Sequence, residues 1–255
     1  MAPAQRATGD RVILPIAPGL VRIDQWIRIR GREIGTDASG PLCIYADVHV
    51  AGGPGGVAYL QAGTTIPAPR RFSIFLPPFA LVQARLERCT IATRALACRP
   101  PRGLIPASAL LLPSSGASFP ESMSDVLACL DRPGVVEITR AVSPRRTAAR
   151  VKALIDATYD QAQPITSLAA ALNVAPATLS RSFRRAFGLP PVRYRHLLRV
   201  VDSLQRLAGG DAPAVVGQDV GFDDLGRFYN VFRRLACATP GTYRPAASRN
   251  AKTRA

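Results

Sequence analysis

The sequence has few of the residues on which catalytic and metal sites depend. It holds 2 histidines, 5 cysteines and 1 tryptophan among 255 residues. A metal enzyme needs clustered His and carboxylate ligands, and a Ser-His-Asp or Cys-His mechanism needs a base. The N-terminal half offers one histidine, His49, beside Asp47 on an alternating segment, where a lone His is usually structural. We expect no catalytic residues, no metal, no cofactor and no enzyme activity.

The cysteines form no recognisable framework. Their number is odd and none lies in a C-x-x-C pair, which argues against disulfides and against a zinc site. We expect buried, small apolar side chains, and a redox-sensing role for Cys89 and Cys98 is the alternative. The positions are Cys43, Cys89, Cys98, Cys129 and Cys237.

The chain also lacks long hydrophobic runs. No stretch of about 18 apolar residues is present, so we expect no membrane span and no membrane partner. Residues 1–10 have no apolar signal core, and the cytoplasm is the expected compartment. The glycines of residues 52–56 are followed by no Lys-Ser/Thr pair, which excludes a typical phosphate loop.

Negative charge is scarce as well, and the net charge is +16. Residues 146–255 hold 17 Lys and Arg against 7 acidic residues, and residues 1–145 hold 16 against 10. The excess fits a polyanionic partner such as nucleic acid. Because both halves are basic, charge alone does not locate the binding site.

Residues 165–188 have the pattern of a helix-turn-helix. A short helix is expected over residues 167–172, followed by a turn at 173–175 in which Asn173 accepts a positive φ. Pro176 suits the first turn of the next helix. In that helix Leu179 and Phe183 share one face, and arginines occupy the other. An apolar back and a front of hydrogen-bond donors suit the DNA major groove.

Residues 215–235 repeat this unit. A short apolar helix, a turn at Gly221-Phe222 and a second helix with Phe228 inside follow in the same order. The tripeptide Phe-Arg-Arg occurs at 183–185 and again at 232–234, 49 residues later, and each copy is followed by a Pro and a Tyr. The pattern is an internal repeat of a supersecondary unit.

Residues from about 150 to 244 resemble the DNA-binding domain of the AraC/XylS family of bacterial transcription regulators, in which a long helix joins two helix-turn-helix units. The resemblance rests on residues spread over both units and the joining helix. They are Leu168, Ala169, Leu179, Ser180, Arg181, Phe183, Gly188, Pro191, Tyr194, Arg199, Val220, Gly221, Phe222, Phe228, Phe232, Arg233, Arg234, Thr239, Pro240, Tyr243 and Arg244.

The resemblance implies a sequence-specific transcription regulator, an activator or a repressor, with double-stranded DNA as its partner and RNA polymerase as a further candidate. We expect Arg181 to contact a guanine, and Arg184 and Arg185 to contact phosphates. The full set of expected DNA-binding residues is Ala177, Thr178, Ser180, Arg181, Arg184, Arg185, Gly226, Arg227, Tyr229, Asn230, Arg233 and Arg234.

The second unit departs from the family pattern. Asn230 stands where Arg or Lys is usual, and Asp223 and Asp224 favour the helix dipole but repel phosphate. Pro213 and Asp219 replace apolar or small residues. We expect this unit to read sequence less strictly than the first, and a purely structural unit docked by phosphates is the alternative.

The helices that support the two units follow the same periodicity. An opening helix is expected over residues 145–161, and a joining helix over 191–207, stopped by Gly209-Gly210. The expected inner stripe of the joining helix is Tyr194, Leu197, Leu198, Val201, Leu204 and Leu207.

Residues 10–112 are β-rich, with Gly- and Pro-marked turns typical of a small barrel or sandwich. Strands are expected within residues 20–34, 43–51, 57–61, 72–76, 81–86 and 90–97, with turns at 52–56, 67–69 and 77–78. Many relatives in the resembled family carry a cupin-like β-barrel here, which implies an unknown small-molecule effector or a homodimer. The fold class is therefore α+β with two domains.

A helix is expected over residues 119–131, beginning near Ser118 or Pro120-Glu121, either in the core or against a partner subunit. Ser143, as N-cap, and Pro144 then mark the boundary. We expect a β-rich effector-binding or dimerisation domain over 1–143 and a double helix-turn-helix domain over 144–255. Two alternatives remain open: a DNA-repair or modification enzyme, and a sensor whose helical domain serves only as a dimer platform.

Overall fold

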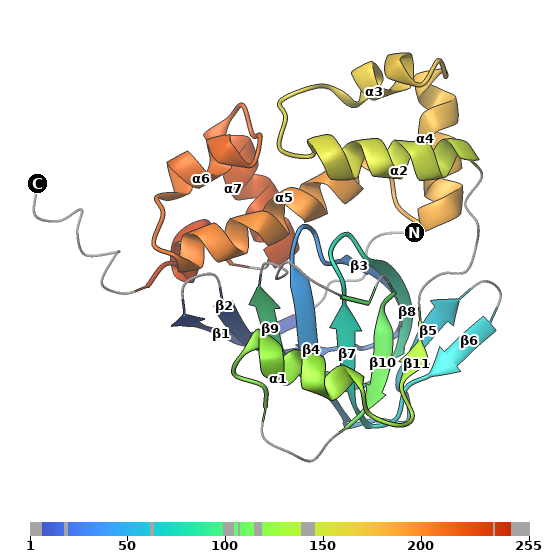
Figure 1. The fold of residues 1–255 in the computed structure, drawn as a ribbon, viewed down its shortest axis with the longest axis vertical. Helices are drawn as coiled ribbons and strands as arrows, with labels where there is room; N and C mark the ends of the chain where they lie inside the picture. Colours follow the sequence, from blue (N-terminus) through green and yellow to red (C-terminus); the bar gives the residue numbers. More distant parts are fainter. Residues whose placement is uncertain are drawn as a thin grey trace, which may run out of the picture. The chain divides into compact units, whose positions relative to one another are not determined.

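In the computed structural model the chain divides into two compact units, Met1–Ala141 and Val142–Ala255. The structure describes residues 7–17, 20–61, 64–98, 105–106, 108–114, 119–138, 146–236 and 238–245. The first unit is built mainly of strands and the second of helices, which confirms the α+β fold class (Figure 1). The expected boundary at Ser143 and Pro144 lies outside the described residues.

The first unit contains two antiparallel sheets. The larger has the strand order β1-β2-β9-β4-β7-β10-β11, and the smaller has the order β3-β8-β5-β6. The strands are β1 (Ala7–Ala17), β2 (Leu20–Arg28), β3 (Arg32–Ala38), β4 (Cys43–Ala51), β5 (Val57–Gln61), β6 (Thr64–Pro67), β7 (Arg71–Leu76), β8 (Leu81–Glu87), β9 (Thr90–Cys98), β10 (Leu110–Pro113) and β11 (Val136–Glu137).

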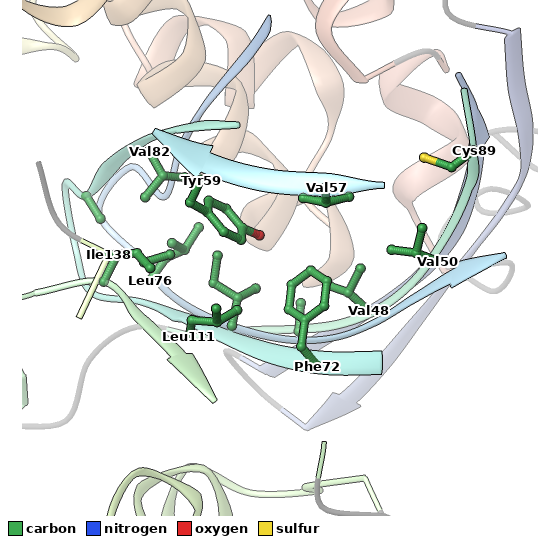
Figure 2. Close-up of a cluster of buried hydrophobic side chains, with 14 of the residues drawn as sticks. Val48, Val50, Val57, Tyr59, Phe72, Leu76, Val82, Cys89, Leu111 and Ile138 are labelled. Carbon is green, nitrogen blue, oxygen red and sulfur yellow. The ribbon is translucent and has the colours of Figure 1, made fainter. Parts of the chain in front are cut away.

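The larger sheet is buried on both faces at its centre, because successive side chains of a strand point to opposite sides. On β4, Val48 and Val50 belong to the core that also includes Val57 and Tyr59 of β5 (Figure 2). Tyr45 belongs instead to a second cluster, with residues of α1 (Met123–Leu130). One face of the larger sheet therefore packs against the smaller sheet, and the other carries α1.

One strand expectation is wrong. Residues 20–34 form no single strand: β2 pairs with β9 in the larger sheet and β3 pairs with β8 in the smaller one, so residues 29–31 carry the chain between sheets. The break expected at residues 67–69 is confirmed apart from Pro67, which is the last residue of β6; the chain enters β7 at Arg71.

Helix α1 begins later than expected. Ser122 is its N-cap, because its side chain accepts a hydrogen bond from the Asp125 backbone and Asp125 reciprocates. Pro120 and Glu121 precede the helix, and Ser118 lies outside the described residues. Val126 and Cys129 pack on the larger sheet, so the buried face of α1 contributes to this chain's own core.

The second unit consists of six helices and one 3-10 turn among its described residues. They are α2 (Arg146–Thr158), α3 (Ile165–Ala171), α4 (Pro176–Phe187), α5 (Pro191–Ala208), α6 (Pro213–Asp219), α7 (Leu225–Ala236) and η1 (Pro240–Tyr243). Helix α5 runs from the α3–α4 pair to the α6–α7 pair (Figure 1). No helix in the described part of the chain is long and apolar enough to cross a membrane.

Candidate nucleic-acid interface

The first helix-turn-helix is formed by α3 and α4, as the sequence predicts. Asn173 has a φ of 52°, and Pro176 occupies the first turn of α4. Gly188 ends α4 in the left-handed conformation, with a φ of 78°, and its N–H bonds to the Arg184 carbonyl. Each end of α4 is thus fixed by a residue whose backbone suits that place.

One side of α4 is anchored in the core of the second unit. Leu179 and Phe183 are fully buried. The ring of Phe183 lies 5.6 Å from that of Tyr194 in α5 and 4.6 Å from that of Phe187. The Tyr194 hydroxyl in turn donates a 2.7 Å hydrogen bond to Asp156 of α2. This packing fixes the orientation of α4, so its opposite side is presented rigidly.

The second helix-turn-helix, α6 and α7, repeats this construction. Gly221, with a φ of 91°, takes the place that Asn173 holds in the first helix-turn-helix. Asp224 caps α7 by accepting a hydrogen bond from the Arg227 backbone, so one of the two unusual carboxylates is occupied in holding the helix start. Asp223 lies 3.9 Å from the Arg227 guanidinium, an exposed and weak ion pair.

The buried side of α7 is aromatic. Phe228 and Phe232 are fully buried, with ring centroids 5.6 Å apart. Phe228 also packs on Phe222 of the turn, and Phe232 on Tyr243 of η1. Helix α7, like α4, is therefore anchored by buried aromatic side chains.

All twelve expected DNA-binding residues are exposed. Six lie on α4 and six on α7, and each residue of the first set has its counterpart 49 positions later in the second. The α4 set is Ala177, Thr178, Ser180, Arg181, Arg184 and Arg185, and the α7 set is Gly226, Arg227, Tyr229, Asn230, Arg233 and Arg234.

One exposed residue of α7 was not predicted. Leu225, at the start of the helix, is 45% exposed, and it lies one helical turn before Tyr229, which is 38% exposed. An exposed Leu at a helix start is a weak sequence signal, because single surface hydrophobics are common. Together the two side chains give the exposed side of α7 an apolar character that the set on α4 lacks.

The joining helix departs from its predicted pattern. Tyr194, Leu198 and Leu207 are buried as expected, but Leu197, Val201 and Leu204 are only partly buried. Helix α5 contacts α2, α4, α6, α7 and η1, so it is enclosed on several sides rather than along one stripe. Its other buried residues are Pro191, Arg195, His196, Arg199, Val200, Asp202, Ser203, Gln205 and Ala208.

His196 of α5 is 8% exposed and stacks on the Phe222 ring at 5.9 Å. Burial, followed by the positive charges of Arg227, Arg199, Arg195 and Arg234, lowers its pKa to about 4. No described group hydrogen-bonds its Nε2. The side chain is therefore neutral at physiological pH and acts as a packing residue.

The described cysteines lie within the first unit and are all buried, as expected; Cys237 lies outside the described residues. Burial raises the pKa of Cys43 to about 12 and that of Cys98 to about 11. Burial also raises the pKa of Cys89. These thiols remain protonated at neutral pH, which makes them poor nucleophiles. Within the described ranges, no group of three or more His, Cys, Asp or Glu could hold a metal ion.

Comparison with known proteins locates a family domain in the second unit. Residues 168–246 match the family model of a helix-turn-helix domain. No curated protein matches the chain.

Several solved structures resemble it. The DNA-binding domain of AdpA, a global transcriptional factor solved with a target DNA, is 25% identical over 43% of this chain and 98% of its own, with a TM-score of 0.37. A probable AraC family regulator from Rhodopseudomonas palustris is 22% identical over 39% and 98%, with a TM-score of 0.35. ToxT from Vibrio cholerae is 11% identical over 83% and 95%, with a TM-score of 0.42.

Proposed function

We propose that this chain, a DNA-binding transcription regulator with an AraC-type helix-turn-helix domain, inserts α4 and α7 into successive major grooves on one side of a duplex. One observation carries the proposal: each of the two helices buries its aromatic side and exposes a basic side. Helix α5 has 18 residues and is about 27 Å long at 1.5 Å per residue. That length suits the separation of grooves one helical turn apart, about 34 Å.

The internal repeat supports a division of labour within each recognition helix. Arg184 and Arg185 of α4 recur as Arg233 and Arg234 of α7. A basic pair that is identical in both units fits contacts to phosphates, which are the same at every sequence.

The four other pairs all differ in residue type between the units, which fits base contacts at two different half-sites. These pairs are Ala177 and Gly226, Thr178 and Arg227, Ser180 and Tyr229, and Arg181 and Asn230. We therefore propose that one monomer binds two half-sites of different sequence, so that its target is not a palindrome.

The chemistry of each set indicates a base preference. Arg181 suits guanine, because guanidinium nitrogens can donate to both O6 and N7. Asn230 suits adenine, and the apolar surfaces of Leu225 and Tyr229 suit the thymine methyl group. We propose that α4 reads a half-site containing G·C pairs and α7 one rich in A·T pairs.

Selection from a random duplex library with the full chain tests the proposed function. The expected result at moderate salt is two enriched blocks whose centres lie about 10 base pairs apart. Enrichment no greater than that of the starting library would overturn the proposal. A single enriched block would leave only one reading unit and make the other structural.

For the first unit we propose the control function, namely binding of a small effector or formation of a homodimer. This assignment rests on the resemblance stated above, and RNA polymerase remains the proposed protein partner in the cytoplasm. Genome-wide mapping of bound DNA with and without candidate metabolites tests the effector, and sedimentation of the full chain tests the dimer. Unchanged occupancy with every candidate, together with a monomeric chain, would remove the assignment.

We propose that the chain is not an enzyme. A repair or modification activity in the first unit would require a reactive thiolate or a metal, and burial raises the pKa of Cys43 and Cys98. Zinc determination on the purified chain tests the alternative. Stoichiometric zinc would reopen it.

A further inference from the structure

Helix α5 carries a row of charged side chains that we call the polar stripe: the buried Arg195, Arg199 and Asp202, and the partly exposed Arg206. The first three are 7%, 4% and 1% exposed. Burial of charged groups is unfavourable unless hydrogen bonds and opposite charges compensate for the lost water. The contacts that compensate therefore indicate what the stripe holds together.

On one side the stripe holds residues 159–163, the segment that leads from α2 into the first helix-turn-helix. Arg199 donates from Nε to the Tyr159 carbonyl, at 2.5 Å, and from Nη2 to the Gln161 carbonyl, at 2.8 Å. Arg195 donates to the Gln163 carbonyl. Burial, followed by the nearby arginines, lowers the pKa of Arg199 to about 10, so its guanidinium stays charged at neutral pH.

On the other side Arg199 meets the turn of the second helix-turn-helix. Its Cζ lies 5.1 Å from the centroid of the Phe222 ring, a cation–π contact. A Cβ at Gly221 would lie 2.8 Å from Nη2 of Arg199 and 2.2 Å from the carbonyl oxygen of Asp160. The turn of the second helix-turn-helix therefore lies directly on Arg199 and on the segment that enters the first helix-turn-helix.

The stripe continues toward α6 through a more exposed pair. Arg206 donates to Asp202 at 3.3 Å and to Asp219, at the end of α6, at 3.1 Å. The side chains of Arg206 and Asp219 are 29% and 48% exposed, so water competes for this ion pair and its contribution is small. Arg199 is better placed to hold the two helix-turn-helix units together, because it is buried where it contacts the 159–163 segment and the Phe222 ring.

We propose that Arg199 is a positioning residue that fixes the two helix-turn-helix units relative to each other, and thereby sets the one half-site spacing that the protein accepts. The proposal rests on the proposed function, since spacing has meaning only if both units read DNA. Arg199 touches no base or phosphate in this role. It acts by holding the 159–163 segment and the Gly221-Phe222 turn on a single guanidinium.

The consequence follows from the geometry of the duplex. Inserting five base pairs between two half-sites rotates one by about half a turn, so a rigid pair of units cannot reach both. If the two helix-turn-helix units can move relative to each other, the protein can still bind the displaced half-site, and part of the affinity is kept. Lys at position 199 would keep the charge, but an ammonium lacks the planar fork that serves two carbonyls while stacking on a ring.

The experiment measures the affinity of the full chain for its selected duplex and for the same duplex with five base pairs inserted between the blocks. The ratio of the two affinities is the spacing penalty. For the wild type we expect a penalty of about 100-fold, because the contacts of one unit are lost. For Arg199→Lys we expect a penalty at least about 10-fold smaller, with unchanged affinity for a duplex that carries only the first block.

Asp219→Asn is the matched control, because it removes the exposed ion pair with Arg206 and leaves Arg199 intact. This variant is expected to keep the wild-type penalty. Circular dichroism at the assay temperature establishes that each variant is folded. A wild-type penalty in folded Arg199→Lys would overturn the proposal.

If Arg199→Lys does not fold, Phe222→Leu takes its place, because it removes the ring face and keeps a buried apolar side chain. An unchanged penalty in that variant would equally overturn the proposal. Failure of the inference is distinguishable from failure of the proposed function. A wild type that enriches no duplex, or only a single block, refutes the proposed reading by two units, whereas one that binds paired blocks at any spacing refutes only the role of Arg199.

Discussion

The backbone of Gly217 in α6 lies against the ring of Phe228 in α7, so closely that a Cβ at Gly217 would stand 3.0 Å from Cδ1 of Phe228. Phe228 has no exposed surface and packs on Phe222 and Phe232, so its ring has little room to move. In the first helix-turn-helix the equivalent places hold Ala169 on α3 and Leu179 on α4, a larger residue on the short helix and a smaller one on the longer helix.

Gly217→Val is therefore expected to lower the free energy of unfolding by about 2 kcal/mol, since overpacking outweighs the gain in helix propensity. Urea unfolding of the full chain, followed by circular dichroism, measures the change. The double variant Gly217→Ala with Phe228→Leu recreates the Ala–Leu packing of the first helix-turn-helix. Its loss should be smaller than the sum of the two single losses by about 1 kcal/mol. Strict additivity would show that the two residues are not in packing contact.

Arg181→Ala is expected to change sequence preference, because this residue faces the bases in the proposed complex. Discrimination at one G·C pair should fall by about 1–3 kcal/mol. Arg185→Ala should instead weaken all duplexes alike and reduce the salt slope of the affinity by about 1. Fluorescence anisotropy with single-base variants of the selected duplex, at several salt concentrations, separates the two effects. A uniform loss in both variants would contradict the assignment.

Asn230→Ala is expected to remove the preference for adenine at one position in the half-site of α7, by about 1–3 kcal/mol. Arg233→Ala is the matched control on the same helix, and it should weaken every duplex equally because it removes a phosphate contact. Repeating the library selection with each variant measures both changes. An unchanged A·T block in the Asn230 variant would favour the alternative in which the second unit docks through phosphates alone.

His196 makes stability dependent on pH. Its pKa is depressed to about 4 by burial and by the surrounding arginines, while the unfolded chain has an ordinary histidine. Between pH 6.5 and 4 the unfolded state thus binds the additional proton, and stability falls as the pH is lowered. The loss from this group approaches about 3 kcal/mol near pH 4.

Carboxylates also titrate in that pH range. Urea unfolding at pH 7 and pH 4.5 is therefore compared between two variants. His49→Gln changes an exposed residue and should keep the full pH-dependent loss. His196→Gln removes the buried imidazole and should lose about 2 kcal/mol less between the two pH values. Equal losses in the two variants would show that His196 titrates normally.

The buried thiols should be unreactive in the native chain. In a Cys237→Ser variant, a thiol reagent such as Ellman's reagent at pH 8 should label none of the four remaining cysteines within minutes, and all four after denaturation. Burial and the raised pKa values of Cys43 and Cys98 are the reasons. Rapid native labelling of Cys89 or Cys98 would revive the redox-sensing interpretation.

The recognition helices were predictable because local chemistry fixes their ends. Pro176 can occupy the first turn of a helix but not its interior, and Gly188 takes a left-handed conformation that ends α4. In α4 and α7, the position of Phe183 or Phe232 relative to the arginines then predicts which side of the helix is buried and which is exposed. The domain-level identification followed from the same residues.

The polar stripe and the end of α2 were not predictable from local patterns. Helix α2 was expected to reach residue 161 but ends at Thr158. The carbonyls of Tyr159 and Gln161 lie beyond the end of α2, and each accepts a hydrogen bond from Arg199. Arginines at such spacing in a helix normally indicate a solvated face, and only tertiary packing reverses that expectation. The strand break at residues 29–31 has a similar origin, because it depends on which sheet each half of the segment joins.

Hydroxyl-radical footprinting of the full chain on its selected duplex shows whether α4 and α7 enter successive grooves, because it maps protected backbone at single-nucleotide resolution. We expect two protected patches on one side of the duplex, centred about one helical turn apart, one over the G·C-containing block and one over the A·T-rich block. A single patch, or uniform protection with no periodicity, would contradict it.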